Sequence, residues 1–573
     1  QKNNFGEEPT SNTIWGLDVN YRHEVPFITK MVDWLPGIST TAPSNLSLTA
    51  EFAHFIPGMA STGNSEGSVS YIDDFEGAKS GIDIKGITTW HLASTPQDYR
   101  TSLPMFPETA PGTGLAYGFN RARLAWYRID DLFYSSNCPD NIDVEDRSKP
   151  YARRISEQEV FPNKELAAGE VTNIYELNLA YYPNEKGPYN YDVGSSEFSA
   201  GIDADGHLIN PASRWGGIMR ALEYTDFETQ NIETIEFWLM DPFIESPDHS
   251  GGKLYINLGD ISEDILRDGR KSFENGLPTS TELSNIDTTI WGRVPTTQPI
   301  VNAFDNDESA RKYQDVGYDG LSSTHGIEDE QSFFSSYLQS IALLHGSGSP
   351  AYQQAWADPS GDDFRYYRSS YYDQNDVKIN DRYKYYNNPE GNSPSDADNE
   401  EDYSTAAQTL PNVEDINKDN TLSEAENYYQ YVIDLDPAHM VIGENYIVDI
   451  HDAQNVQLAN GETTNCRWYQ FRIPIREPDS KVGNIQGFQS IRFMRMFLSQ
   501  FDQPIILRFA TLKLVYGTWR KYSESLLQPG DYSSGNDAGT SFSISTVSIE
   551  ENGSRSPVPY VIPPGIEREQ WYS

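Results

Sequence analysis

The stretch WGLDVNYR at residues 15–22 alternates strictly between two kinds of side chain. One parity reads Trp, Leu, Val, Tyr, and the other reads Gly, Asp, Asn, Arg. Because successive side chains of a β-strand point to opposite faces, this alternation predicts a strand with one apolar and one polar face. The stretch LSLTAEF at residues 46–52 repeats the pattern, so the sequence predicts two such strands close together in the chain.

The segment between these strands has a different period. Its apolar residues, from Phe27 to Leu35, fall at helical spacing and stop before Pro36 and Gly37, which predicts a short amphipathic helix or turn. Two alternating segments of about ten residues with aromatic edges are typical of outer-membrane barrel strands. A hairpin with one face on a soluble core has the same pattern, so the pattern alone leaves both interpretations open.

From Gly63 onward, short alternating runs separated by turn residues predict antiparallel β-sandwich structure of a jelly-roll-like kind, with few short helices. The predicted organisation has four parts. They are barrel strands with an amphipathic turn (1–62), a first sandwich (63–279), an irregular acidic region rich in Tyr, Asp and Asn (280–427), and a second sandwich with a Pro-rich C-terminal segment (428–573). A short echo between residues 231–240 and 484–496 suggests that the two sandwiches are related.

The amino-acid composition narrows the possible classes of function. The 573 residues carry 42 Lys and Arg against 85 Asp and Glu, a formal net charge of −43. Such a charge argues against nucleic acid and anionic lipid headgroups as partners, and favours a secreted or surface-exposed protein that can hold cations. No secretory signal and no run of about 18 apolar residues is visible, and we interpret the chain as a piece of something longer.

The sharpest motif is DINKDNTLSEAE at residues 415–426, which has the spacing of an EF-hand calcium loop. The sixth position is Asn420 where EF-hands have Gly, but Asn also tolerates the left-handed turn needed there. Calcium takes six to eight hard oxygen ligands, so the motif predicts a structural Ca²⁺ site; the alternative is an acidic turn that caps a following helix. The predicted ligands are Asp415, Asn417, Asp419, the Thr421 carbonyl, Ser423 and Glu426.

The remaining motifs give weaker evidence for a functional site. The acidic stretches at residues 203–206, 305–308 and 315–320 read as polar turns more readily than as cation sites, and Asp73, Asp74 and Glu76 lack any sign of paired-carboxylate catalysis. No GxSxG, HExxH, P-loop or dinucleotide fingerprint is present, so we expect no enzyme. Cys138 and Cys466, 328 positions apart, are expected to be free thiols, although spacing alone does not exclude a disulfide.

Several phrases in consistent order resemble one family. They are VPFITKMVD at residues 25–33, PGIST at 36–40, YIDDFEG at 71–77, YQDVGYDGL at 313–321, the loop at 415–426 and VPYVIPPGIERE at 558–569. Together they are similar to the SprA/Sov family of gliding-motility and cell-surface proteins, the outer-membrane translocon of the Bacteroidetes type IX secretion system.

The resemblance implies an internal segment of a very large outer-membrane barrel, with the alternating hairpin in the barrel wall and the sandwiches inserted between barrel strands so that they cap the pore. We expect the sandwiches to lie on the extracellular side of the outer membrane. It implies as partners a PorV-like barrel shuttle protein, a plug protein, cargo with a C-terminal signal domain, and outer-membrane lipid. The alternative from a different class is a calcium-stabilised cell-surface carbohydrate-binding or adhesion module, in which aromatic residues such as Trp215 and Trp238 stack on sugars if they are not core residues.

Overall fold

The protein forms two units, which are described separately: residues 1–78 with 546–573, and residues 79–545. The computed structural model describes residues 13–34, 36–37, 43–56, 81–98, 100–101, 104–162, 164, 173–271, 279–297, 305, 307–315, 317–318, 323, 327–385 and 413–517. The phrases at 71–77 and 558–569 lie outside these residues.

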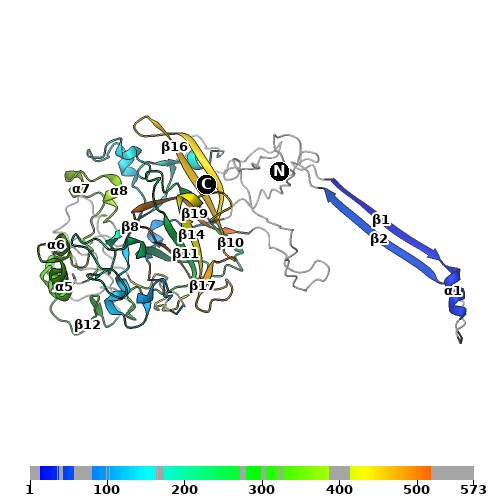
Figure 1. Ribbon diagram of the computed structural model, residues 1–573, viewed down its shortest axis with the longest axis horizontal. Coiled ribbons are helices and arrows are strands. Elements are labelled where there is room, and N and C mark those ends of the chain that lie inside the picture. Colours follow the sequence, from blue (N-terminus) through cyan, green and yellow to red (C-terminus); the bar gives the residue numbers. More distant parts are fainter. Residues whose placement is uncertain are drawn as a thin grey trace. The chain divides into compact units, whose positions relative to one another are not determined.

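The first unit contains one long antiparallel hairpin (Figure 1). Strand β1 (Thr13–Glu24) pairs with β2 (Asn45–Ile56) along its whole length, from Thr13 opposite Ile56 to Glu24 opposite Asn45. Helix α1 (Pro26–Asp33) lies in the connection and begins at a proline, whose missing N–H costs nothing in the first helical turn. The alternation and the helical spacing in the sequence therefore predicted these three elements correctly.

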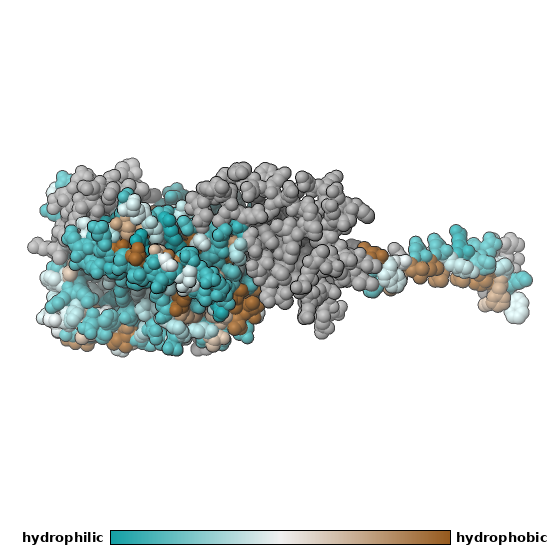
Figure 2. All heavy atoms as spheres, turned by 90° about the horizontal axis from the view of Figure 1, so that it is seen from above, coloured by the Kyte–Doolittle hydropathy of each residue, from teal (hydrophilic) through white to brown (hydrophobic). Residues whose placement is uncertain are grey.

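The two faces of the hairpin differ sharply in polarity. The register places Leu17 opposite Phe52 and Tyr21 opposite Leu48, so apolar side chains of both strands share a face. In Figure 2 one face of this hairpin is hydrophobic and the opposite face is hydrophilic. Leu17 is 60% exposed and Phe52 is 51% exposed, which means that nothing in the described structure covers this apolar face.

The second unit is built on two antiparallel sheets. The first runs in the order β15 (Ile447–Gln457), β16 (Thr463–Pro474), β10 (Ile232–Met240), β19 (Ile505–Tyr516), β8 (Leu177–Lys186) and β5 (Ala122–Tyr127), with β3 (Gly81–Asp83) also pairing with β19. The second runs β17 (Ser480–Val482), β14 (Asn427–Leu435), β11 (Gly252–Asp260), β18 (Phe493–Ser499), β9 (Trp215–Ala221) and β4 (His91–Leu92).

Side chains from both sheets meet in a common hydrophobic core. Phe237 of β10, Ile256 of β11 and Met496 of β18 all belong to it. Within the core Phe237 stacks on Phe471 with ring centroids 4.7 Å apart. Removing such a buried ring typically costs about 3–5 kcal/mol, so this interface is a main source of the unit's stability. The architecture is a β-sandwich, and the fold class predicted from the sequence, mainly antiparallel β with few short helices, is confirmed.

The sandwich differs from the predicted organisation in its boundaries. Strands from the expected first sandwich (63–279) alternate within each sheet with strands from the expected second one (428–573): β10 lies between β16 and β19, and β11 lies between β14 and β18. The two similar segments at 231–240 and 484–496 contribute to different sheets, because the first contains β10 and the second contains the start of β18. Alternation reports only which face of a strand is buried and carries no information on its neighbours, so distant pairing could not be read from it.

Short helices and small hairpins surround the sheets. Two of the helices are α4 (Ile327–Phe333) and α5 (Ser335–His345). The remaining short elements are α2 (Glu157–Val160), α3 (Glu308–Arg311), α6 (Pro350–Ala357), α7 (Ser370–Gln374), α8 (Ile379–Arg382), β6 (Ile155–Ser156), β7 (Asn173–Ile174), β12 (Ile286–Thr288) and β13 (Arg293–Pro295). Among the described helices, none combines the length and apolar character needed to cross a bilayer.

Tyrosines from the region at residues 280–427 pack on the sandwich. Tyr383 is fully buried and stacks on Tyr127 of β5 with ring centroids 4.4 Å apart. Tyr367 also stacks on Tyr383, with ring centroids 4.8 Å apart. Aromatic stacking of this kind adds about 0.5–1.5 kcal/mol beyond the area buried, so it helps to hold these tyrosines on the sandwich.

Candidate functional site

The predicted calcium loop forms an ordered turn directly before β14. Asp415 accepts hydrogen bonds from the backbone N–H groups of Asp419 (3.0 Å) and Asn420 (2.9 Å). Asp419 in turn accepts from the hydroxyl of Thr421 at 2.6 Å and from the N–H of Thr421 at 2.8 Å, and these two bonds lower the pKa of its carboxyl. Asn420 has φ of 66°, so it adopts the left-handed conformation expected of the sixth loop position.

Two arginines bind acidic side chains of this loop: Arg495 in β18 and Arg492 directly before β18. Arg495 of β18 binds Glu426 through both of its terminal nitrogens, at 3.0 Å each. Arg492 binds Asp419 at 2.9 Å and Ser423 at 3.1 Å. Glu426, the predicted bidentate ligand, would have to leave Arg495 to bind an ion. The helix expected after Ser423 is absent from the structure, and β14 begins at Asn427 instead.

A second loop, residues 261–271, holds the first one in place. The buried Glu263 accepts from the N–H groups of Ile416 (2.9 Å), Asn417 (3.2 Å) and Ser423 (3.3 Å). Burial raises the pKa of Glu263 despite these bonds. The carboxylate thus replaces the backbone partners that an irregular segment lacks.

The same two loops bring three further carboxylates together. Oxygens of Asp264, Asp268 and Glu414 lie within 4.8 Å of one another. Burial, followed by repulsion from Asp264 and Asp268, raises the pKa of Glu414 well above its usual value. Burial likewise raises the pKa of Asp264 to about 6. Sequence inspection missed this cluster, because its members are separated by about 150 positions and only the acidic run from Glu263 to Asp268 hinted at it.

Among the described residues, two other acidic groups have the same spacing, and the predicted set of Asp415, Asp419 and Glu426 is not one of them. Glu330, Asp358 and Asp362 form the first group, and Ser360 donates to both Glu330 and Asp362. The carboxylates of Asp415, Asp419 and Glu426 therefore do not meet within this spacing, and the full ligand set with its amide, hydroxyl and carbonyl oxygens stays a prediction.

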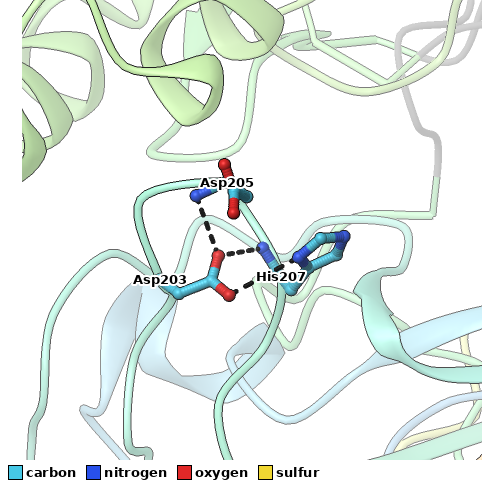
Figure 3. Close-up of side chains that lie close together, drawn as sticks. All are labelled: Asp203, Asp205 and His207. Atoms are coloured by element: carbon cyan, nitrogen blue, oxygen red, sulfur yellow. Dashed lines mark hydrogen bonds and ion pairs between the residues drawn. The ribbon is translucent and has the colours of Figure 1, made fainter.

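The other group lies on an exposed turn (Figure 3). Asp203 accepts from the N–H groups of Asp205 and His207, both at 2.9 Å, and its second oxygen lies 3.5 Å from the His207 ring. These bonds within the turn are those of an Asx-type turn, as the sequence favoured for residues 203–206.

Other sequence expectations also have a definite place in the structure. Trp215 and Trp238 are both buried core residues and cannot stack on a ligand at the surface. Cys138 and Cys466 are free thiols, as expected. Asp73, Asp74 and Glu76 lie outside the described residues.

The fold and the loops define a class: an acidic antiparallel β-sandwich tied together by buried charges, in a chain that also carries a hairpin with an uncovered apolar face. Residues 336–573 match the family model of a motility related/secretion protein. This match supports membership of the SprA/Sov family, which the sequence resembles. No curated protein matches the chain.

Proposed function

We propose that this chain is a segment of the outer-membrane protein-conducting translocon of the type IX secretion system. In this proposal the β1–β2 hairpin belongs to the barrel wall, and the sandwich is a domain inserted between barrel strands. The segment acts by structure and binding, without catalysis of its own. Membership of a family of motility related/secretion proteins supports this class of function.

The uncovered apolar face of the hairpin carries the proposal. Strands of 12 residues exceed the roughly 9–11 residues that a tilted strand needs to span a bilayer. The apolar side chains on one face, including Leu17 and Phe52, suit contact with lipid, whereas the polar parity suits a barrel lumen. A water-soluble protein rarely leaves such a face uncovered.

The edges and the end of the hairpin support the same function. Two strands alone leave a row of unpaired N–H and C=O groups along each outer edge, and lipid contains no water to satisfy them. Further strands on both sides would pair these groups, as a barrel does. Exposed Phe27, Met31 and Trp34 at α1 suit the boundary between bilayer and water, where amphipathic helices and aromatic rings concentrate.

The sandwich suits an exposed position. Its chain is strongly acidic, with a net charge of −43 over all 573 residues, which favours solubility and repels anionic lipid headgroups. We therefore place it on the extracellular side of the outer membrane. The partners in this proposal are a PorV-like barrel shuttle protein, a plug protein and secreted cargo with a C-terminal signal domain.

A labelling experiment on the full-length protein in native outer membranes tests the hairpin's position. Leu17→Cys and Asn20→Cys, each in a Cys138→Ala, Cys466→Ala background, are labelled with an environment-sensitive fluorophore, and lipids carrying a quencher are added. We expect strong quenching at residue 17 and little at residue 20, because the two positions lie on opposite faces. Equal, weak quenching at both positions contradicts a lipid-facing hairpin and favours a soluble surface module.

A further inference from the structure

We propose that Asp264, Asp268 and Glu414 form a binding site for a divalent cation, with calcium as the ion that fits best. The site is distinct from the loop at residues 415–426, although it adjoins it. It ties together two loops that are far apart in the chain, one after β11 and one before β14. The proposal does not depend on the translocon function.

The geometry brings the three carboxylates to one point. One oxygen of each lies within 4.8 Å of the other two, close enough for a single ion to contact all three. Asp264 is held by the N–H groups of Asp268 (3.1 Å) and Gly269 (3.0 Å), which fixes its orientation. Glu414 is held by the N–H groups of Ile265 (2.6 Å) and Leu266 (3.2 Å).

Two oxygens of the cluster are left over. Oε2 of Glu414 and Oδ2 of Asp268 are buried atoms without a hydrogen-bond partner among the described residues. Glu414 as a whole is fully buried, at 0% exposure. A buried carboxylate oxygen with no partner is costly, so its presence points to a ligand that takes the second lone pairs.

Two basic side chains near the cluster, those of Arg270 and Lys271, have carboxylate partners outside it. The guanidinium of Arg270 attracts Asp268 but forms its ion pair with Asp287. The amine of Lys271 lies 3.9 Å from Asp415. Three adjacent carboxylates repel one another, so a bound cation would stabilise their charged forms.

The donor set favours calcium. All three ligands are hard carboxylate oxygens, with neither sulfur nor imidazole in the group, which disfavours zinc and copper. The ligands come from irregular loops, and calcium accepts flexible geometry with backbone carbonyls and waters completing its shell. Magnesium demands stricter octahedral geometry.

The test is calcium binding by the full-length protein in detergent after removal of metal with a chelator. Binding is measured by isothermal titration with calcium chloride, and melting temperature is recorded with and without the salt. Asp268→Asn keeps an oxygen for the N–H of Arg270, which Asp268 accepts at 2.9 Å, and so preserves the fold of the loop. Glu414→Gln removes the buried charge at the same volume.

We expect calcium to raise the melting temperature of the wild type, and binding to weaken by about tenfold or more in Asp268→Asn and in Glu414→Gln. Without calcium, Glu414→Gln should be at least as stable as the wild type, because an unpaired buried charge is gone. Asp205→Asn, on an exposed turn, serves as the control and should bind as the wild type does.

Three outcomes overturn the proposal. They are no calcium uptake by the wild type, unchanged uptake in both cluster variants, and loss of uptake in Asp419→Asn with full retention in Asp268→Asn. The last result would assign the ion to the predicted loop at residues 415–426. If Glu414→Gln does not fold, the Asp268→Asn result decides alone.

Discussion

Arg495 and Glu426 form a buried two-point ion pair, in which each terminal nitrogen of the guanidinium binds one carboxylate oxygen at 3.0 Å. Arg495 is fully buried and the Glu426 side chain is 7% exposed. Glu426 also accepts from the N–H of Ser262 at 3.2 Å. The pair therefore joins β18, the end of the 413–426 loop and the 261–271 loop at one point.

This pair changes how the EF-hand-like sequence is interpreted. In an EF-hand the twelfth residue supplies two oxygens to the ion, and here those oxygens are bound by an arginine. The calcium site at Asp415, Asn417, Asp419, Thr421, Ser423 and Glu426 remains a prediction. In the structure the same residues form an acidic turn, which is stabilised by contacts with Arg492, Arg495 and Glu263.

The first prediction concerns this ion pair. Arg495→Met should lower the free energy of unfolding by about 3–5 kcal/mol, because it leaves the buried Glu426 carboxylate without its partner. The measurement is urea unfolding of the chain in detergent at neutral pH. Replacing both partners, as Arg495→Met with Glu426→Gln, should recover part of the loss, because no uncompensated charge then remains.

The matched control is an exposed pair on the other sheet. Arg467 binds Asp452 at 2.6 Å, but the two side chains are 47% and 49% exposed. Arg467→Met should cost no more than about 1 kcal/mol, because water screens the pair. Similar losses in Arg467→Met and Arg495→Met would show that burial does not determine the strength of these pairs.

The second prediction concerns pH. Glu108 is fully buried, accepts one hydrogen bond from Asn120 at 2.9 Å, and leaves its other oxygen without a partner in the described structure. Burial raises its pKa from 4.5 to about 7. The folded protein therefore binds the proton of the Glu108 carboxyl more tightly than the unfolded chain does. The contribution of protonated Glu108 to the free energy of unfolding is fully present below about pH 4.5 and is lost as the pH rises through about 7.

Glu108→Gln isolates this contribution, because the amide keeps the shape and stays neutral. The variant should equal the wild type in stability near pH 4 and exceed it by about 3 kcal/mol near pH 8, an order-of-magnitude value from the shift in pKa. Unfolding measured across this range gives the difference curve. A difference that does not vary with pH would mean that Glu108 does not titrate in this interval.

The third prediction concerns the hairpin in a membrane. Leu17→Lys should reduce the amount of full-length protein assembled in the outer membrane, because a lysine facing the middle of the bilayer costs about 2–4 kcal/mol. Asn20→Lys adds the same charge to the polar face of the same strand and should assemble normally. Protease protection and heat modifiability in isolated membranes measure assembly. Equal assembly of the two variants argues against a lipid-facing strand.

The fourth prediction concerns partners. An antibody against the sandwich should recover, from native outer membranes, a PorV-like barrel protein and a plug protein together with a parent chain several times longer. Mass spectrometry of the recovered complex identifies them. Recovery of a soluble chain bound only to polysaccharide would return the interpretation to a calcium-stabilised surface module.

The sequence by itself predicted much of the local structure and indicated the family. Residues 15–22 and 46–52 alternate so strictly that both hairpin strands and their apolar face followed from period alone. The rule does not reach β9, because its seven residues alternate neither in size nor in polarity. Family phrases placed along the chain identified its class, which the match over residues 336–573 supports.

Only the tertiary structure decided which strands pair and which charges meet. β10 ends at Met240 and β16 begins at Thr463, so the two paired strands are far apart in the chain, and their register depends on the packing of the whole core. Asp264 and Glu414 are separated by 150 positions in the numbering, and their carboxylates converge because the loops after β11 and before β14 lie at the end of neighbouring strands. Charge pairs such as Arg495 with Glu426 likewise depend on distance in space, which spacing along the chain does not encode.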